Sequence, residues 1–180
     1  MKSTEVYREA REVLGPWCKR QGFKRTTGGL LGWQKTFGEK HLIFWLQCSQ
    51  DGWDPYAGSK FIVEFQLSSS PRIGACGADC VRHRLPHFLT KDLLEIVRAQ
   101  QNRVIRSLPK PSSNHFVLQM DKQTVDWYLA KFKEVETPYR NTDDIWFRYG
   151  SAENVRGWAE LLLQVLPSVV QQLESFAPLG

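Results

Sequence analysis

The spacing of hydrophobic residues along this 180-residue chain changes twice, and this constrains the fold more than any other feature. From Thr4 to Gln21 apolar residues recur every three or four positions, which is typical of one helix face. From Phe23 to Ser69 they alternate with polar residues, as in strands that bury one face. From Thr90 onward the helical spacing returns. The pattern predicts an α+β fold, in which an N-terminal helix precedes an antiparallel sheet of four to five strands and a helical C-terminal half packs on that sheet.

The ends of the first helix are marked by residues with special backbone requirements. Gly22 follows the last periodic residues and is expected to cap the helix, because glycine adopts the left-handed backbone of a C-terminal cap without strain. Pro16 falls inside the pattern and has no N–H group to donate. We therefore expect a kink or a break near Leu14.

The two best-defined strands indicate which side chains share a face. Four residues in each, Leu42, Phe44, Leu46 and Cys48, then Phe61, Val63, Phe65 and Leu67, are expected to face the helices. The opposite face then gathers Trp45, Glu64, Gln34, Gln47 and Gln66. A tryptophan among amides and one acid offers apolar area with a polar edge, so this face is a candidate ligand-binding surface. The alternative is that Trp45 and Ile43 pack under the C-terminal helices, and a slip of one residue in register would invert the faces.

A glycine- and proline-containing segment, Asp51 to Ser59, separates these two strands and carries Trp53 and Tyr56. Loops held by a rigid sheet often carry binding contacts, so both rings are candidate ligand-binding residues. The alternative, which we favour, is a simple connection whose rings cover the edge of the sheet.

Four residues of a type that binds zinc lie close together in the sequence, at Cys76, Cys80, His83 and His87. Zinc is therefore a possible cofactor. Structural zinc sites usually separate two ligand pairs by a longer stretch of chain, which lets the chain turn back around the metal. The favoured interpretation is that no cofactor binds here, that the thiols are reduced, and that the histidines lie on a basic loop.

The second half of the chain is expected to be mainly helical. Residues 70–89 contain several glycines and prolines and are expected to form a loop or an irregular crossover. Helices are then predicted from a cap at Thr90 to about Leu108, from a cap at Asp121 through Val135, and from a cap at Ser151 to Phe176. A further strand is predicted at 145–149.

The first half of the chain also resembles a known family. Gly22-Phe23-Lys24 after a helix, Trp33-Gln34-Lys35, and the strands 42–49 and 61–68 are similar to a bacterial family catalogued as domain of unknown function forty-three-oh-four. The resemblance covers about residues 1–90 and implies an uncharacterised bacterial α+β protein. It supplies no catalytic residue.

Composition and charge exclude several classes of protein and indicate which partners to expect. A 42% hydrophobic and 24% charged chain of this length excludes a disordered protein and predicts a single domain over residues 1–180. The charged N-terminus lacks the apolar run of a secretion signal, and no run is long enough to cross a bilayer, so a cytoplasmic protein without membrane contact is expected. The net charge of +5 is compatible with nucleic acid, but no nucleic-acid motif is present, and a protein partner is favoured.

No catalytic motif is recognisable, and whether the protein is an enzyme stays open. The sequence favours a non-catalytic binding module that holds a protein or a small ligand, and an immunity-like role is one version of this hypothesis. The alternative is a metal-dependent enzyme or a zinc-stabilised nucleic-acid binder centred on residues 76–87.

Overall fold

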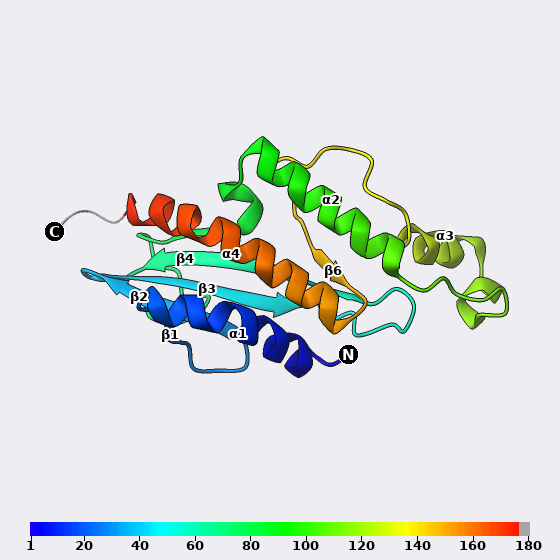
Figure 1. The fold of residues 1–180 in the computed structure, drawn as a ribbon, viewed down its shortest axis with the longest axis horizontal. Coiled ribbons are helices and arrows are strands. Elements are labelled where there is room, and N and C mark those ends of the chain that lie inside the picture. The colour runs from blue at the N-terminus through cyan, green and yellow to red at the C-terminus, as the bar shows by residue number, and fades with distance from the viewer. Residues whose placement is uncertain (177–180) are drawn as a thin grey trace.

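A twisted sheet with helices packed on one of its faces forms the body of the protein (Figure 1). The computed structural model describes residues 1–176. In chain order its elements are α1 (Ser3–Arg20), β1 (Lys24–Arg25), β2 (Leu31–Phe37), β3 (Lys40–Cys48), β4 (Ser59–Ser68), β5 (Val81–Arg84), the 3-10 helix η1 (Leu85–Phe88), α2 (Lys91–Ser107), the 3-10 helix η2 (Phe116–Gln119), α3 (Lys122–Ala130), β6 (Phe147–Tyr149) and α4 (Ala152–Glu174). The predicted α+β class is confirmed.

The sheet is antiparallel throughout, with the strand order β1-β2-β3-β4-β5 and with β6 also paired to β4. The strands β5 and β6 therefore share one edge of β4. The first pairs with Glu64 to Leu67 and the second with Ser59 to Phe61. The expected meander is confirmed. Within the described residues the sheet has six strands rather than the expected four to five, and the additional strand is β5.

The helix α1 ends as its sequence predicts. Gly22 has a φ of +79°, its N–H donates to the carbonyl of Lys19, and the N–H of Phe23 donates to the carbonyl of Cys18. This pair of bonds is the Schellman arrangement, which satisfies the last free carbonyls of a helix. The chain can then turn directly into β1.

The helix α1 continues through Pro16, so no break occurs near Leu14. Its stripe of Val6, Ala10, Leu14 and Cys18 is fully buried on both sides of the proline. Burial of this stripe outweighs the roughly 3 kcal/mol that a proline inside a helix costs. The helix α4 likewise continues through Pro167.

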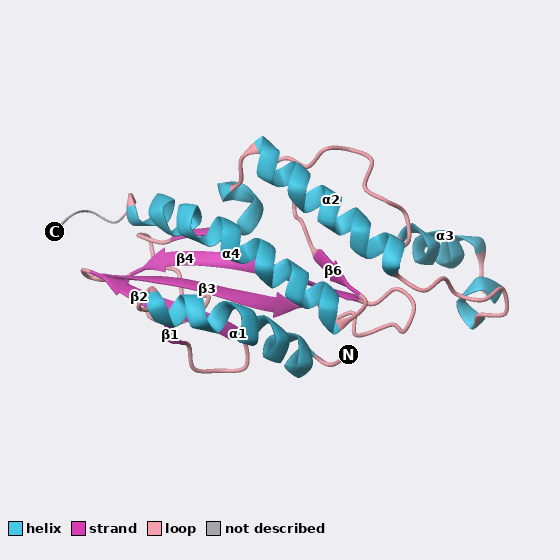
Figure 2. Ribbon diagram, in the orientation of Figure 1, coloured by secondary structure: helices cyan, strands magenta, loops and turns pink. Residues whose placement is uncertain are grey.

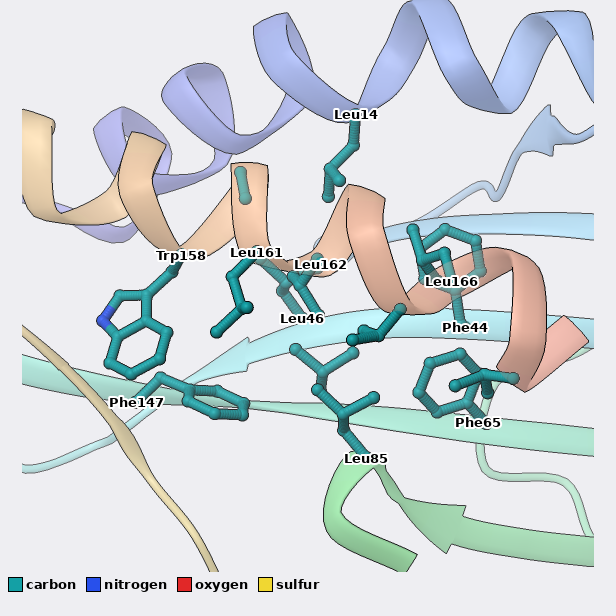
Figure 3. Packing of buried hydrophobic residues seen from close by; sticks show 14 of the residues in the cluster. Leu14, Phe44, Leu46, Phe65, Leu85, Phe147, Trp158, Leu161, Leu162 and Leu166 are labelled. Atoms are coloured by element: carbon teal, nitrogen blue, oxygen red, sulfur yellow. The ribbon is translucent and has the colours of Figure 1, made fainter. Parts of the chain in front are cut away.

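The main core lies between the helices and one face of the sheet. Figure 2 shows α1 and α4 crossing in front of the central strands. Figure 3 shows side chains from both layers pointing toward one another, including Leu14 of α1, Leu162 of α4, Phe44 of β3 and Phe147 of β6. The predicted inward residues of the two central strands all belong to this core or pack against it.

Three expectations about the second half are wrong in detail. Residues 70–89 contain β5 and η1 rather than only a loop. The last helix ends at Glu174, and Phe176 is 55% exposed. The third helix ends at Ala130 and buries only Tyr128 of its expected face, whereas Leu129 is 39% exposed.

Bonds from other elements explain the early end of α3. The carbonyl of Lys131 accepts from Arg148, and the N–H of Val135 donates to Asn102 Oδ1 at 2.7 Å. The carbonyl of Val135 accepts from both Asn102 and Arg98. These groups therefore bond to α2 and β6 instead of continuing the helix.

Candidate functional site

A cavity of about 290 Å³, lined by both charged and apolar residues, lies where β6 pairs with the start of β4. Four segments that are distant in sequence surround it, namely the loop after β3, the middle of α2, the residue after α3, and the segment leading into β6. Figure 1 shows this loop, α3 and β6 meeting at the end of the sheet away from the C-terminus. The lining residues are Asp51, Gly52, Asp54, Ala57, Gly58, Ser59, Lys60, Gln101, Lys131, Tyr139, Asp144, Ile145, Trp146 and Arg148.

The position of Arg148 follows from strand alternation. Its neighbours Phe147 and Tyr149 are buried in the core, so Arg148 projects from the other face, directly opposite Lys60. Its guanidinium donates to the carbonyl of Ala57 at 3.0 Å and to the carbonyl of Lys131. Its Nε–H is buried and has no acceptor among the described residues. Arg148 therefore joins two walls of the cavity, and its buried Nε–H stays without a hydrogen bond within residues 1–176.

Asp54 fixes the loop that forms another wall. Its carboxylate accepts from the N–H groups of Tyr56 and Ala57 at 2.8 and 2.6 Å, and from the hydroxyl of Tyr128 at 3.1 Å. Burial by itself would raise the pKa of Asp54, but these hydrogen bonds outweigh burial and hold its pKa below 3.8. The loop is thus attached to α3 through a charged hydrogen-bond acceptor.

Gln101 of α2 connects β6 to the helical layer. Its side-chain amide donates to the carbonyl of Trp146 at 3.1 Å and accepts from the N–H of Arg148 at 3.2 Å. Gln101 is 5% exposed, so these bonds satisfy backbone groups that β6 would otherwise leave unpaired. The indole of Trp158 in α4 donates to the carbonyl of Arg148 at 2.6 Å. The strand β6 is therefore paired with β4 along one edge and hydrogen-bonded to side chains of α2 and α4 along the other.

Burial changes the pKa of three groups that line the cavity. It lowers the pKa of Lys131 below 10.5; the carboxylates of Asp54 and Asp51 oppose this effect, and the positive charges of Arg148 and Lys60 add to it. It also lowers the pKa of Arg148. It raises the pKa of Tyr139 to about 12, with Asp143 contributing, so this phenol is a neutral hydrogen-bond donor at pH 7.

The acidic residues around the cavity all have partners. Asp51 lies 3.0 Å from Lys60, Asp144 is paired with Arg84, and Asp54 accepts the three hydrogen bonds described above. Within residues 1–176, by contrast, no carboxylate oxygen lies within 4.0 Å of the Arg148 guanidinium or the Lys131 ammonium. The ammonium of Lys131 instead lies 3.8 Å from the ring centroid of Trp127.

The predicted binding face is correctly oriented, but it is not open. Trp45, Glu64 and Gln66 do lie on the face opposite the main core, with Trp45 directly paired to Glu64. However, Trp45 is 1% exposed and Glu64 is 5% exposed. Arg82 lies over the indole at 5.2 Å and donates to Glu64 at 2.6 and 2.8 Å. The expectation of a solvent-exposed indole is therefore wrong.

Gln66, on the same face, is covered by the chain that follows β4, to which its side chain is hydrogen-bonded. Its amide nitrogen donates to Ser68 Oγ and to the carbonyls of Arg72 and Ala75, and its oxygen accepts from the N–H of Gly74. The side chain is fully buried, so it has no donor or acceptor left for a ligand. Gln34 and Gln47 are half-buried on this face, and Gln34 Oε1 is without a partner among residues 1–176.

The aromatic residues of the 51–59 loop face inward. Trp53 stacks on Tyr149 with ring centroids 5.9 Å apart, and Tyr56 packs edge-on against His115 at 4.9 Å. Neither ring lines the cavity, whereas their neighbours Asp54, Ala57 and Gly58 do. The loop does border a candidate site, but through residues other than those the sequence singled out.

The cysteine and histidine cluster does not form a metal site as arranged. Cys76 and Cys80 are bonded to each other, with Cα atoms 5.1 Å apart, so the expectation of reduced thiols is wrong for this pair. His83 and His87 stack on one another with ring centroids 3.7 Å apart. Among the residues that the structure describes, no group of three or more histidine, cysteine, aspartate or glutamate side chains could hold a metal ion.

Sequence reasoning missed Arg148, Trp146, Lys131, Tyr139 and Gln101. Alternation could have identified two of them, because Trp146 and Arg148 alternate with apolar residues in the predicted strand 145–149 and therefore lie on the opposite face. No sequence pattern indicated Lys131, since the helix before it was expected to continue to Val135.

No family model, curated protein or solved structure matches this chain. The family resemblance of residues 1–90 and the cytoplasmic location therefore remain predictions. In the described part of the chain, no helix is both long enough and apolar enough to span a bilayer.

Proposed function

We propose that this protein is a non-catalytic binding module and that the cavity beside Arg148 is its ligand site. The observation that carries the proposal is that the cavity walls are fixed before any ligand arrives. Asp54 attaches the loop to α3, Arg148 bonds to both Ala57 and Lys131, and Gln101 holds β6. Such preorganisation lowers the entropy cost of binding, and concave sites with a few fixed polar groups are typical of ligand pockets.

The lining residues favour binding over catalysis. The cavity has no histidine or cysteine among its lining residues, and its three aspartates are engaged with partners of their own. Histidine, cysteine and carboxylate side chains that are free to exchange a proton or attack a substrate are the groups that most often carry general acid–base or nucleophilic chemistry. A bound small molecule, or a side chain of a partner protein, is therefore expected to leave unchanged.

The test is a binding survey of ¹⁵N-labelled protein with neutral, cationic and anionic small molecules. The proposal predicts that at least one class shifts the indole resonance of Trp146 and the amide of Gly58, and that the compound is recovered intact. The proposal fails if every class leaves these resonances unmoved, or if a bound compound is converted.

A further inference from the structure

We infer that the cavity recognises the phosphate group of a small phosphomonoester through Lys131 and Arg148. This inference rests on the proposed function, because it names the ligand class of the same site. Its starting point is a pair of lining cations without an ion-pair partner. Lys131 and Arg148 have no carboxylate within 4.0 Å among the described residues, whereas Asp51 and Asp144 are ion-paired and Asp54 accepts its hydrogen bonds from uncharged groups.

Both cations are partly buried, which makes the missing ion-pair partner significant. A charged group removed from water needs a counter-charge or hydrogen bonds to compensate for its lost hydration. Arg148 donates to two backbone carbonyls, which carry no net charge, and its Nε–H has no acceptor in residues 1–176. Lys131 has aromatic rings nearby, with Trp127 at 3.8 Å and Tyr128 at 5.4 Å. An anion in the cavity would supply the missing counter-charge.

The number and geometry of the donors favour phosphate over carboxylate. A phosphomonoester carries close to two negative charges at pH 7 and three acceptor oxygens, which matches two unpaired cations. Lys60 lies opposite Arg148 and shares its charge with Asp51, and the Tyr139 phenol adds a neutral donor to the lining. A carboxylate would neutralise only one of the two cations.

The size of the cavity indicates that the phosphate belongs to a larger molecule. About 290 Å³ exceeds the space that a free phosphate ion needs, and the lining includes Ile145, Trp146 and Ala57 as well as charged groups. We therefore expect an organic body of sugar size attached to the phosphate.

The experiment compares three ligands of similar shape, glucose 6-phosphate, gluconate and glucose, by titration calorimetry at low ionic strength. The inference predicts that glucose 6-phosphate binds, that gluconate binds at least about tenfold more weakly, and that glucose shows no binding. Lys131→Met is expected to weaken glucose 6-phosphate binding at least about tenfold, and Lys131→Arg to retain most of it. The Arg148 guanidinium donates to the backbone carbonyl of Lys131 and not to its side chain, so both variants keep that hydrogen bond.

The matched control is Lys133→Met, because Lys133 is exposed two residues away and does not line the cavity. It is expected to leave binding unchanged. Equal weakening by Lys131→Met and Lys133→Met would overturn the inference in favour of diffuse charge attraction. Equal or tighter binding of gluconate or glucose would overturn it while leaving the proposed ligand site intact. Absence of glucose 6-phosphate binding overturns it too, and the wider survey of compounds then decides separately whether the cavity binds anything.

Discussion

Lys60 and Arg148 occupy directly opposed positions on β4 and β6, so two cations project side by side from the face of the sheet opposite the main core. Strand pairing and alternation place them, and both line one cavity with Lys131. The carboxylate of Asp51, at 3.0 Å, compensates Lys60, while Arg148 and Lys131 lack such a partner within the described residues. This difference is the basis of the ligand assignment.

Asp54→Asn tests how the loop is held on the cavity. At pH 7 the variant should lose about 1 kcal/mol of unfolding free energy, because hydrogen bonds to a charged acceptor become neutral ones. The pKa of Asp54 is lowered on folding, so its stabilisation is present above 3.8 and is lost as pH falls through the folded-state pKa. The gap between the two proteins should therefore close in acid.

Urea denaturation from pH 7 to pH 2.5 measures that gap. Asp126→Asn on the exposed side of α3 is the control and should show little difference from the unmodified protein at any pH. A gap that stays constant down to pH 2.5 would contradict the role given to the carboxylate.

Gly58→Ala tests the close approach of the loop to β6. Gly58 has a φ of +65°, and an added Cβ would overlap the carbonyl oxygen of Tyr149. Gly52 has a similar φ of +80° but open space around an added Cβ, so Gly52→Ala isolates the backbone strain. We expect about 1 kcal/mol of destabilisation for Gly52→Ala and about 3 kcal/mol or more for Gly58→Ala. Equal losses in thermal unfolding would show that the contact with Tyr149 is unimportant.

Gln66→Leu tests the closure of the face that carries Trp45. The variant leaves the N–H of Gly74 and the carbonyl of Ala75 without their partner and removes one of the two bonds to the carbonyl of Arg72, which should cost about 2 kcal/mol. Hydrogen exchange at the Gly74 amide should accelerate at the same time. Gln47→Leu on the same face is the matched control and should leave that amide protected. If hydrogen exchange at Gly74 is unchanged in Gln66→Leu, Gln66 does not hold the chain that follows β4.

The cysteine pair can be tested by alkylation. Protein unfolded without reductant should take up iodoacetamide at Cys18 and Cys48 only, because Cys76 and Cys80 are bonded to each other. Mass spectrometry counts the added groups. Reduction of this short loop should lower the unfolding free energy by about 2 kcal/mol. Four modified cysteines in unreduced protein would contradict the disulfide.

The sequence predicts the sheet well because alternation and burial agree over long strands. The inward residues Phe44 and Phe65 and the outward residues Trp45 and Glu64 were all assigned to the correct face. It could not predict that this face is covered, because Arg82 lies over Trp45 and the chain after β4 bonds to Gln66, and strand alternation encodes neither contact. Alternation identifies a face, but it does not show what lies over that face.

The cavity was harder to predict for the same reason. Its walls come from four distant segments, and the turn after α3 that places Lys131 depends on bonds from Asn102, Arg98 and Arg148. Local helix propensity favoured continuation to Val135, and these tertiary bonds overrode it. The sequence singled out the loop 51–59, but its rings pack against Tyr149 and His115, and other residues of the loop, including Asp54 and Gly58, line the cavity.

The most direct test of the central claim is the Nε–H resonance of Arg148 in protein labelled with ¹⁵N-arginine, assigned by its loss in Arg148→Lys. This group belongs to a side chain that lines the cavity, so its resonance should respond to a phosphate bound there. We predict that titration with glucose 6-phosphate shifts this resonance with saturation, while the exposed Arg103 side chain stays unchanged. An Arg148 resonance that does not move while the ligand binds elsewhere, or that moves no more than that of Arg103, would contradict the account.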